Sequence, residues 1–246
     1  MPAARLRAGR YDPCPAASPL CYIRPMNLTA TLLPSWVLSA SALVLVLVLA
    51  RAVGGAPWSR LREGHFIHVY LGSCVALLVV WTLKAGVDPG LSFHLLGGTL
   101  FALMFGWELA VVALAVVTLG TTLNIGHGWS VLPVNALVEG VIPILFTAGL
   151  LRLSQRWLPQ HVFVYIFVNG FFGAALAVLA SSLAATALLA VAQAYTMSHL
   201  ESGYLAFVPL LMFSEAWLTG MLVAVLVCYR PEWIRTFDDR LYLQGK

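Results

Sequence analysis

Two histidines and three glutamates stand in or beside apolar segments of this chain, where ionisable residues are rare. The histidines are His94 and His127, and the glutamates are Glu108, Glu139 and Glu215. Neutral imidazole suits nickel, cobalt, copper and zinc, whereas carboxylate oxygens suit harder divalent ions. A bilayer penalises such groups unless they face a protein interior or a cavity. These residue types therefore predict either a metal-ion site or polar contacts between helices inside a membrane protein.

Each histidine has two interpretations. An isolated histidine at the end of an apolar segment can simply bond to a backbone carbonyl or to lipid headgroups. His94 and His127, however, bracket one helical hairpin, so both are expected at the same level near the outer membrane face. Two imidazoles at one level can capture an ion from outside.

Asn135, Glu139 and Glu108 are further polar residues of the stretch between His94 and Pro143. Asn135 and Glu139 are four positions apart, so an α-helix places them on one face. We interpret these three residues as pore-lining or structural polar groups.

Glu215 lies deep within the last apolar segment, in the sequence FSEAWLTG. Direct ion binding is one interpretation. The other is a structural role, in which the carboxyl group is protonated or hydrogen-bonded to Asn135, Asn169 or Thr219.

Composition assigns the chain to the membrane proteins. Of its 246 residues, 61% are hydrophobic and only 10% are charged, against roughly 25% charged in soluble domains. HExxH, GxSxG and Walker A motifs are absent, so an enzyme is not indicated and ATP-driven work would need a separate ATPase. No basic patch with interleaved aromatic residues suggests nucleic-acid binding. The four cysteines form neither a zinc motif nor a disulfide framework.

Seven spans fit the apolar pattern of the sequence best. The run 91–123 would be about 50 Å long as one helix, which exceeds the roughly 30 Å of hydrocarbon. We therefore expect it to break at residues 105–107 into two short helices. The run 162–194 is also long, and a bend is expected near Ser181 and Ser182. The expected spans are 33–50, 66–83, the two halves of 91–123, 134–151, a segment within 162–194, and 204–229.

Basic residues favour seven spans over six. With 91–123 as a single crossing, the basic residues from Arg152 onward change sides and the charge bias disappears. With seven spans, only Lys84 falls on the opposite side from the others. Basic loops remain cytoplasmic, so the N-terminus is expected outside and the C-terminus inside. The basic residues on the inner side are Arg51, Arg60, Arg62, Arg152, Arg156, Arg230, Arg235, Arg240 and Lys246.

The beginning of the chain differs from the rest. Residues 1–25 are rich in proline, alanine and arginine and have no apolar core of signal-peptide type. Their arginines would lie outside in the expected topology. We expect them to be a disordered tail, or an extension upstream of a true start at Met26. Residues 26–246 are expected to form one all-α, seven-helix transmembrane domain.

Four motifs taken together resemble the substrate-capture component of cobalt/nickel energy-coupling-factor transporters, the CbiM/NikM family. They are SFHLLGG with His94, NIGHGW with His127, VNALVEG with Asn135, and FSEAWLTG with Glu215. They follow in the order of the family's motifs at similar intervals, and the resemblance extends from Met26 to the end of the chain.

The resemblance also implies a ligand set. In the family, the terminal amine and a histidine at the second residue coordinate the ion together with the histidine of the third span. Here the implied ligands are His94, the amine of Met26 and the amide oxygen of Asn27, with His127 as a lid or outer partner. The chain departs from the family at Asn27, where nickel- and cobalt-binding members have histidine, and at the Leu-Leu-Gly that follows His94 in place of Pro-Thr-Gly.

The function implied by the resemblance is uptake of a divalent transition-metal ion, nickel or cobalt, across a bacterial-type inner membrane. The ion would be cargo, and no permanently bound cofactor is implied. The implied partners are a transmembrane coupling protein and cytoplasmic ATPase subunits of an ABC-type transporter, besides membrane lipid.

Two alternatives remain open. A relative that has lost transport could serve as a membrane scaffold or as an assembly factor for a metalloprotein, and Asn27 in place of histidine motivates this hypothesis. A membrane enzyme or haem protein is less consistent, because bis-histidine haem ligation needs histidines that face each other within the bilayer, whereas His94 and His127 are expected at span ends.

Overall fold

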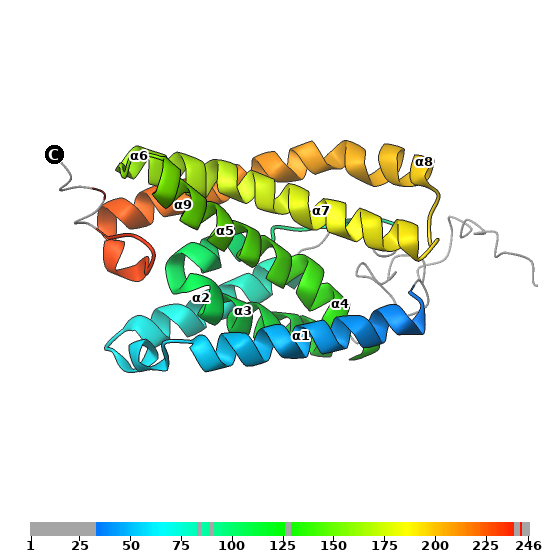
Figure 1. Ribbon diagram of the computed structural model, residues 1–246, viewed down its shortest axis with the longest axis horizontal. Coiled ribbons are helices and arrows are strands. Elements are labelled where there is room, and N and C mark those ends of the chain that lie inside the picture. Colours follow the sequence, from blue (N-terminus) through cyan, green and yellow to red (C-terminus); the bar gives the residue numbers. More distant parts are fainter. Residues whose placement is uncertain (1–32, 83–84, 89–90, 126–128, 239–241, 243–246) are drawn as a thin grey trace, which may run out of the picture.

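The computed structural model describes residues 33–82, 85–88, 91–125, 129–238 and 242. The helices run roughly along one long axis and pack side by side (Figure 1). The predicted extension 1–25 and the residues Met26, Asn27 and His127 lie outside the described residues.

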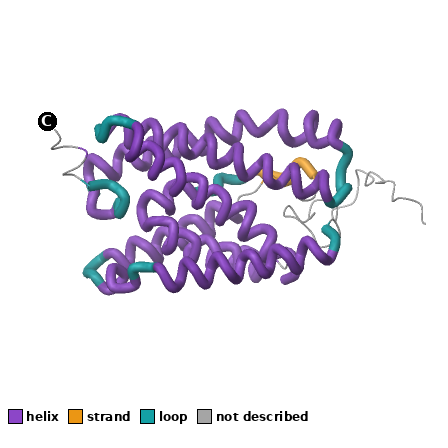
Figure 2. Tube along the Cα trace, in the orientation of Figure 1, coloured by secondary structure: helices purple, strands orange, loops and turns teal. Residues whose placement is uncertain are grey.

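The elements follow one another in a simple order. Several π-helical and 3-10 turns join the α-helices into long continuous rods, including one from Trp129 to Trp157 and one from Val162 to Val191. The two strands are the only strands among the described residues (Figure 2). The elements are α1 Ser35–Gly55, α2 Phe66–Thr82, β1 Ala85–Asp88, β2 Leu91–Phe93, α3 Gly98–Ile125, α4 Leu132–Asn135, α5 Ile142–Trp157, α6 Val162–Val164, α7 Gly173–Val191, α8 Met197–His199 and α9 Val208–Tyr229.

Five helical segments of the described chain are long and apolar enough to cross a membrane. They are Ser35–Gly55, Gly98–Asn124, Trp129–Trp157, Val162–Val191 and Met197–Tyr229, and α2 is a shorter apolar helix. The prediction of a helical, multi-pass membrane protein is confirmed. The five long helices do not by themselves establish the predicted seven crossings.

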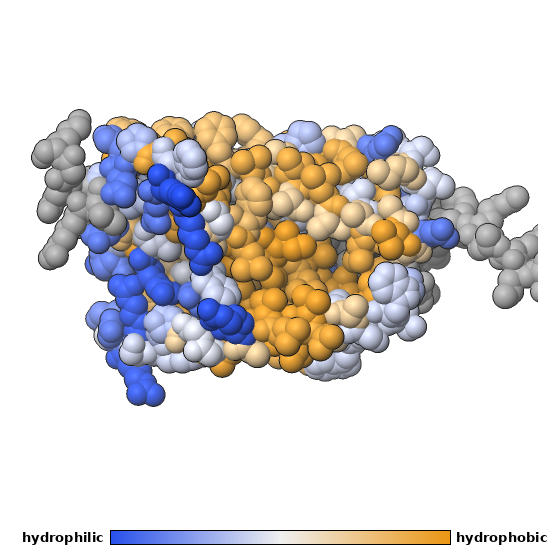
Figure 3. Space-filling model, in the orientation of Figure 1, coloured by the Kyte–Doolittle hydropathy of each residue, from blue (hydrophilic) through white to orange (hydrophobic). Residues whose placement is uncertain are grey.

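The face of the bundle seen in Figure 3 is apolar around its middle. In α1, for example, only Val37, Leu45 and Ala52 are buried, although the helix is apolar on all sides. Large apolar side chains such as Leu210 and Phe213 are more than 60% exposed. A helix that is apolar all round and still exposed faces lipid rather than water.

Helix α3 forms the centre of the bundle and contains a sharp reversal. It is the most buried of the five long segments, and it packs against α1, α2 and α5. Gly106 inside it has non-helical angles, with φ +79° and ψ +162°. We call residues 98–105 the first arm and residues 107–125 the return arm.

Contacts with α2 show that the chain turns back at Gly106. A methyl group added to Gly97 would lie 2.8 Å from Leu77, and one added to Gly120 would lie 2.6 Å from the adjacent Leu78. A straight helix would hold residues 97 and 120 about 35 Å apart. Gly97, just before α3, and Gly120, in its return arm, therefore lie at the same level of α2. The predicted break at residues 105–107 is confirmed as a reversal.

The first arm is shorter than the predicted helix. It is about 12 Å long at roughly 1.5 Å per residue, well below the ~30 Å of a crossing. The stretch before it, expected to be helical from residue 91, instead forms strand β2 and a loop. The strands pair antiparallel, with Ala85 opposite Phe93. A short arm and a hairpin replace the predicted full third helix.

The expected bend at Ser181 and Ser182 is wrong. Both serines are buried inside α7, which is regular from Gly173 to Val191. The irregular part of this rod is instead the π-helical segment Tyr165–Phe172.

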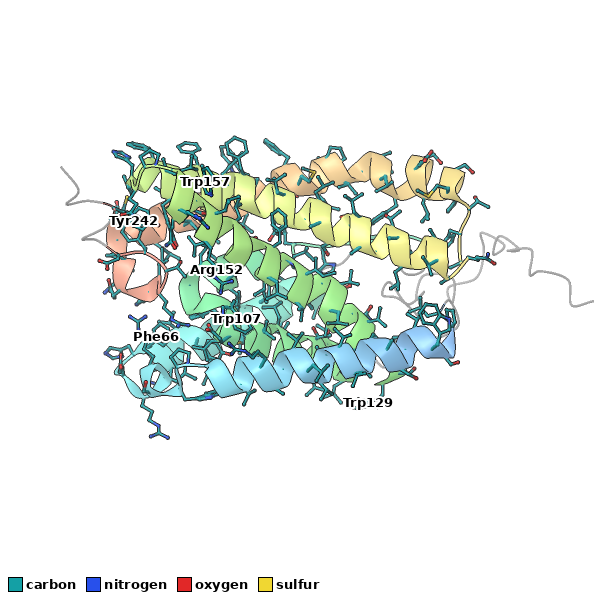
Figure 4. The ribbon with its side chains drawn as sticks, viewed as in Figure 1. Phe66, Trp107, Trp129, Arg152, Trp157 and Tyr242 are labelled. Atoms are coloured by element: carbon teal, nitrogen blue, oxygen red, sulfur yellow. The ribbon has the colours of Figure 1, made fainter. Side chains whose placement is uncertain are left out.

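The most hydrophilic residues on the face seen in Figure 3 gather at one end of the bundle, which we call the arginine-rich end after its arginines. Arg60 and Arg235 border one surface hollow there, and Arg152 and Arg235 border another. Trp107 and Arg152 lie toward this end, whereas Trp129 lies toward the opposite end (Figure 4). Arg60, Arg152 and Arg235, three of the residues predicted to share one side of the membrane, thus lie at one end of the bundle.

Candidate metal-ion site

His94 lies inside the bundle, in the loop of residues 94–97 that connects β2 to α3. Its side chain is only 2% exposed, and its ring packs against Trp81 in a T-shaped arrangement at a centroid distance of 5.0 Å. Trp81 belongs to the last turn of α2, which ends at Thr82. The level of His94 near the outer membrane face stays a prediction.

Glu139 is the ionisable partner of His94. The His94 Nε2 atom lies 3.6 Å from Glu139 Oε2, and the Glu139 side chain is 13% exposed. Glu139 belongs to the π-helical turn Ala136–Val141, between α4 and α5. Two ligands on a tetrahedral ion with bonds of about 2.0–2.1 Å are about 3.3–3.4 Å apart. The separation of these two atoms is therefore close to what a shared ion requires.

Asn135 is buried one turn before Glu139, but in a different environment. The predicted α-helical face is replaced by a π-helical turn. The Oδ1 atom of Asn135 is buried and has no hydrogen-bond partner among the described residues. Such an atom is unusual in a folded protein, and it marks this turn as a polar point within the apolar bundle.

A small cavity adjoins His94 and Glu139. Its volume is about 40 Å³, more than the roughly 10–15 Å³ that one water needs. Three hydroxyl-bearing residues line it together with the histidine and the glutamate: Ser181, Ser182 and Tyr204. A cavity with imidazole, carboxylate and hydroxyl groups can hold a hydrated or partly hydrated cation.

Hydrogen bonds fix the hydroxyl groups of this cavity. Ser181 donates to the carbonyl of Val138 over 2.5 Å, and Tyr204 donates to Ser182 over 3.4 Å. Sequence reasoning treated the two serines only as a bend and did not select Tyr204. The sequence signal that could have indicated this cavity was the pair of adjacent hydroxyl-bearing residues, Ser181 and Ser182, in an otherwise apolar run.

Glu215 fixes the loop that carries His94. Its carboxylate accepts hydrogen bonds from the backbone N–H groups of Leu96 at 2.9 Å and Gly97 at 2.7 Å. The side chain is buried, with the whole residue 2% exposed. Glu215 is thus hydrogen-bonded to backbone amides rather than to Asn135, Asn169 or Thr219.

Glu108 lies apart from this site. Its carboxylate pairs with Arg235 at 3.1 Å, at the arginine-rich end. The same guanidinium donates to the carbonyl of Phe105 at 3.1 Å. Glu108 thus stabilises the reversal of α3 and does not contact His94.

The described residues contain no group of three or more histidine, cysteine, aspartate or glutamate side chains that could hold a metal ion. Among the predicted ligands, only His94 is described, and Glu139 stands beside it. The remaining predicted ligands, Met26, Asn27 and His127, lie outside the described residues, so their placement stays a prediction.

Comparison with known proteins supports a transporter fold. One solved structure, described as a transition metal transporter, matches with a TM-score of 0.68 and 17% sequence identity. The match covers 82% of this chain and 93% of that one, and at this identity it shows the fold alone. The comparison with curated proteins gives no match. The model of the CbiM family, the cobalt uptake substrate-specific transmembrane region, matches residues 27–233, and the chain therefore belongs to this family of metal-uptake membrane proteins.

Proposed function

We propose that this chain is the substrate-capture subunit of an energy-coupled transporter that takes up a divalent transition-metal ion, nickel or cobalt. The chain binds the ion from the outer side of a bacterial-type inner membrane. Because its sequence has no ATPase motif, a transmembrane coupling protein and cytoplasmic ATPases supply the energy. Membership of the cobalt-uptake family supports the class of substrate.

The observation that carries the proposal is the burial of His94 beside Glu139 at a small polar cavity. Ionisable side chains inside a membrane are expensive and mark ion pathways by default. An imidazole and a carboxylate form a mixed nitrogen and oxygen donor set, which suits borderline divalent ions.

Two side chains do not complete the coordination of such an ion. We propose that the amine of Met26 and the amide oxygen of Asn27 reach the site as further ligands, with His127 as a lid over it. Glu139 is a further ligand of the ion in this proposal. Its carboxylate supplies a negative charge, which the neutral amide of Asn27 does not.

We also propose seven crossings, with the N-terminus outside and the C-terminus inside. The first arm and the β1–β2 hairpin together would make one crossing, and the return arm the next. This count keeps the arginine-rich end on one side of the membrane, as basic loops require.

Ion uptake by cells that express the chain with its partner subunits tests the proposal. His94→Ala should abolish nickel and cobalt accumulation while leaving the amount of membrane-inserted protein unchanged. His68→Ala is the matched control, because His68 is an exposed histidine near the N-terminal end of α2. Unchanged uptake in His94→Ala would contradict the capture role and favour the scaffold alternative.

A further inference from the structure

The first arm is held at both ends by one part of the chain, residues 208–237, which we call the C-terminal segment. At the beginning of the arm, Glu215 on α9 accepts the backbone N–H groups of Leu96 and Gly97. The two bonds span nearly half the chain in sequence, and both are short. This end of the arm is thus tied to α9 by a buried carboxylate.

The other end of the arm is tied to the tail that follows α9. The backbone N–H of Arg235 donates to Met104 O at 2.9 Å, and its guanidinium donates to Phe105 O at 3.1 Å. The Thr236 hydroxyl donates to Leu103 O at 2.7 Å. Three consecutive carbonyls at the end of the arm are therefore satisfied by two residues of the C-terminal segment.

These contacts match what a short helix needs. The first N–H groups and the last C=O groups of a helix have no partner within it. An anion near its N-terminus and a cation near its C-terminus complement its dipole, and Glu215 and Arg235 occupy those two places. A helix of two turns is only marginally stable by itself. The C-terminal segment that holds the first arm therefore sets its position.

The arm connects the arginine-rich end to the ion site. Arg235 lies at the arginine-rich end, which borders two surface hollows. His94 lies two residues before Leu96, which Glu215 holds. A shift of the tail would therefore move the end of the arm, and through the rigid arm the loop that carries His94.

We propose that Glu215 and Arg235 are positioning residues through which the C-terminal segment sets the geometry of the His94 loop. Displacement of the tail, as by a partner that docks at the arginine-rich end, then weakens ion binding at His94 and favours release. The proposal rests on the proposed function for its ligand, but its mechanical part concerns this chain alone.

A purely structural role makes a different prediction. If the contacts served stability only, their loss would lower the fraction of folded protein but leave the ion affinity of the folded fraction unchanged. Coupling between two sites appears as a change in ion affinity, typically of about 5- to 150-fold. Ion affinity and the protection of the loop amides therefore separate the two roles.

The experiment uses the full chain in lipid nanodiscs, with Ni²⁺ and Co²⁺ as probes. Glu215→Gln keeps the side-chain length but replaces one acceptor oxygen with a donor, which opposes an N–H group. Arg235→Gln removes the cation at the far end. Each variant should weaken Ni²⁺ or Co²⁺ binding by roughly fivefold or more. Each should also speed amide hydrogen exchange at residues 94–97, and Arg235→Lys should partly restore both properties.

Arg230→Gln is the matched control. Arg230 lies on the same tail, but its ion pair with Glu232 at 3.3 Å is exposed, with the two side chains 61% and 57% accessible. This variant should leave ion affinity and loop exchange as in the unaltered protein.

Two outcomes would overturn the proposal. One is Arg235→Gln with unchanged ion affinity and unchanged exchange at residues 94–97. The other is an equal loss of ion affinity in Arg230→Gln.

If the unaltered protein binds neither ion, the proposed function fails, and the exchange measurement alone decides the mechanical link. Faster exchange at the loop in Arg235→Gln then supports it, and unchanged exchange overturns it. If Glu215→Gln does not fold, Arg235→Gln and Arg235→Lys carry the test.

Discussion

At the scale of single residues, Glu139 distinguishes the ion site of this chain. Its carboxylate lies 3.6 Å from His94 Nε2 and borders the same cavity as Ser182 and Tyr204. In a low-dielectric interior a negative charge beside a divalent ion is strongly stabilising. The imidazole alone offers one neutral donor, so most of the electrostatic stabilisation at this site would come from Glu139.

Glu139→Gln tests this contribution. The amide keeps the shape of the side chain and removes its charge, so nickel or cobalt affinity should fall by about tenfold or more, equivalent to ~1.4 kcal/mol. Isothermal titration of the purified variants measures the change. Glu201→Gln, at an exposed glutamate, is the control and should bind as the unaltered protein does. Equal affinity in Glu139→Gln and Glu201→Gln would remove Glu139 from the site.

At the scale of elements, the reversal of α3 decides where the site lies. The turn depends on Gly106, whose φ of +79° disfavours any residue with a side chain. A Cβ atom there would also collide with the guanidinium of Arg235. The first arm ends at this turn, and its length sets the depth of the His94 loop.

Gly106→Ala should therefore destabilise the protein by roughly 1–3 kcal/mol, measured as a lower unfolding temperature in detergent or lipid. Gly149→Ala is the control, because Gly149 lies within helix α5 and has no neighbour within 4 Å of an added methyl group. An alanine there should be neutral, or stabilising by up to about 1 kcal/mol. Equal unfolding temperatures for both variants would contradict the strained turn.

Some of these elements could be predicted from sequence and others could not. An apolar run too long for one crossing, with a glycine near its middle, predicted the break at Gly106. The partners of Glu215 could not be predicted, because backbone amides distant in sequence leave no pattern of side chains. The hairpin before the first arm was missed, although Pro89 and Gly90 form a turn-favouring pair in the sequence between its strands.

At the scale of the whole molecule, the proposed topology requires that the two ends of the bundle face opposite sides of the membrane. Trp129 and Trp157 are suitable reporters, since they lie toward opposite ends (Figure 4) and are 63% and 73% exposed. In a cysteine-free background, Trp129→Cys should react with a membrane-impermeant maleimide in intact spheroplasts. Trp157→Cys should react only after permeabilisation. The reverse pattern would overturn the proposed orientation, and labelling of both positions from one side would contradict the crossing count.

The central claim is that His94 holds a transported ion, and the metal content of the purified full chain tests it most directly. Elemental analysis, combined with intact mass to define the N-terminus, should find about one nickel or cobalt ion per chain after growth with either metal. His94→Ala should lose the ion while keeping its fold, and His68→Ala should retain it. Equal metal content in His94→Ala and the unaltered protein, or no metal in either, would contradict the capture role.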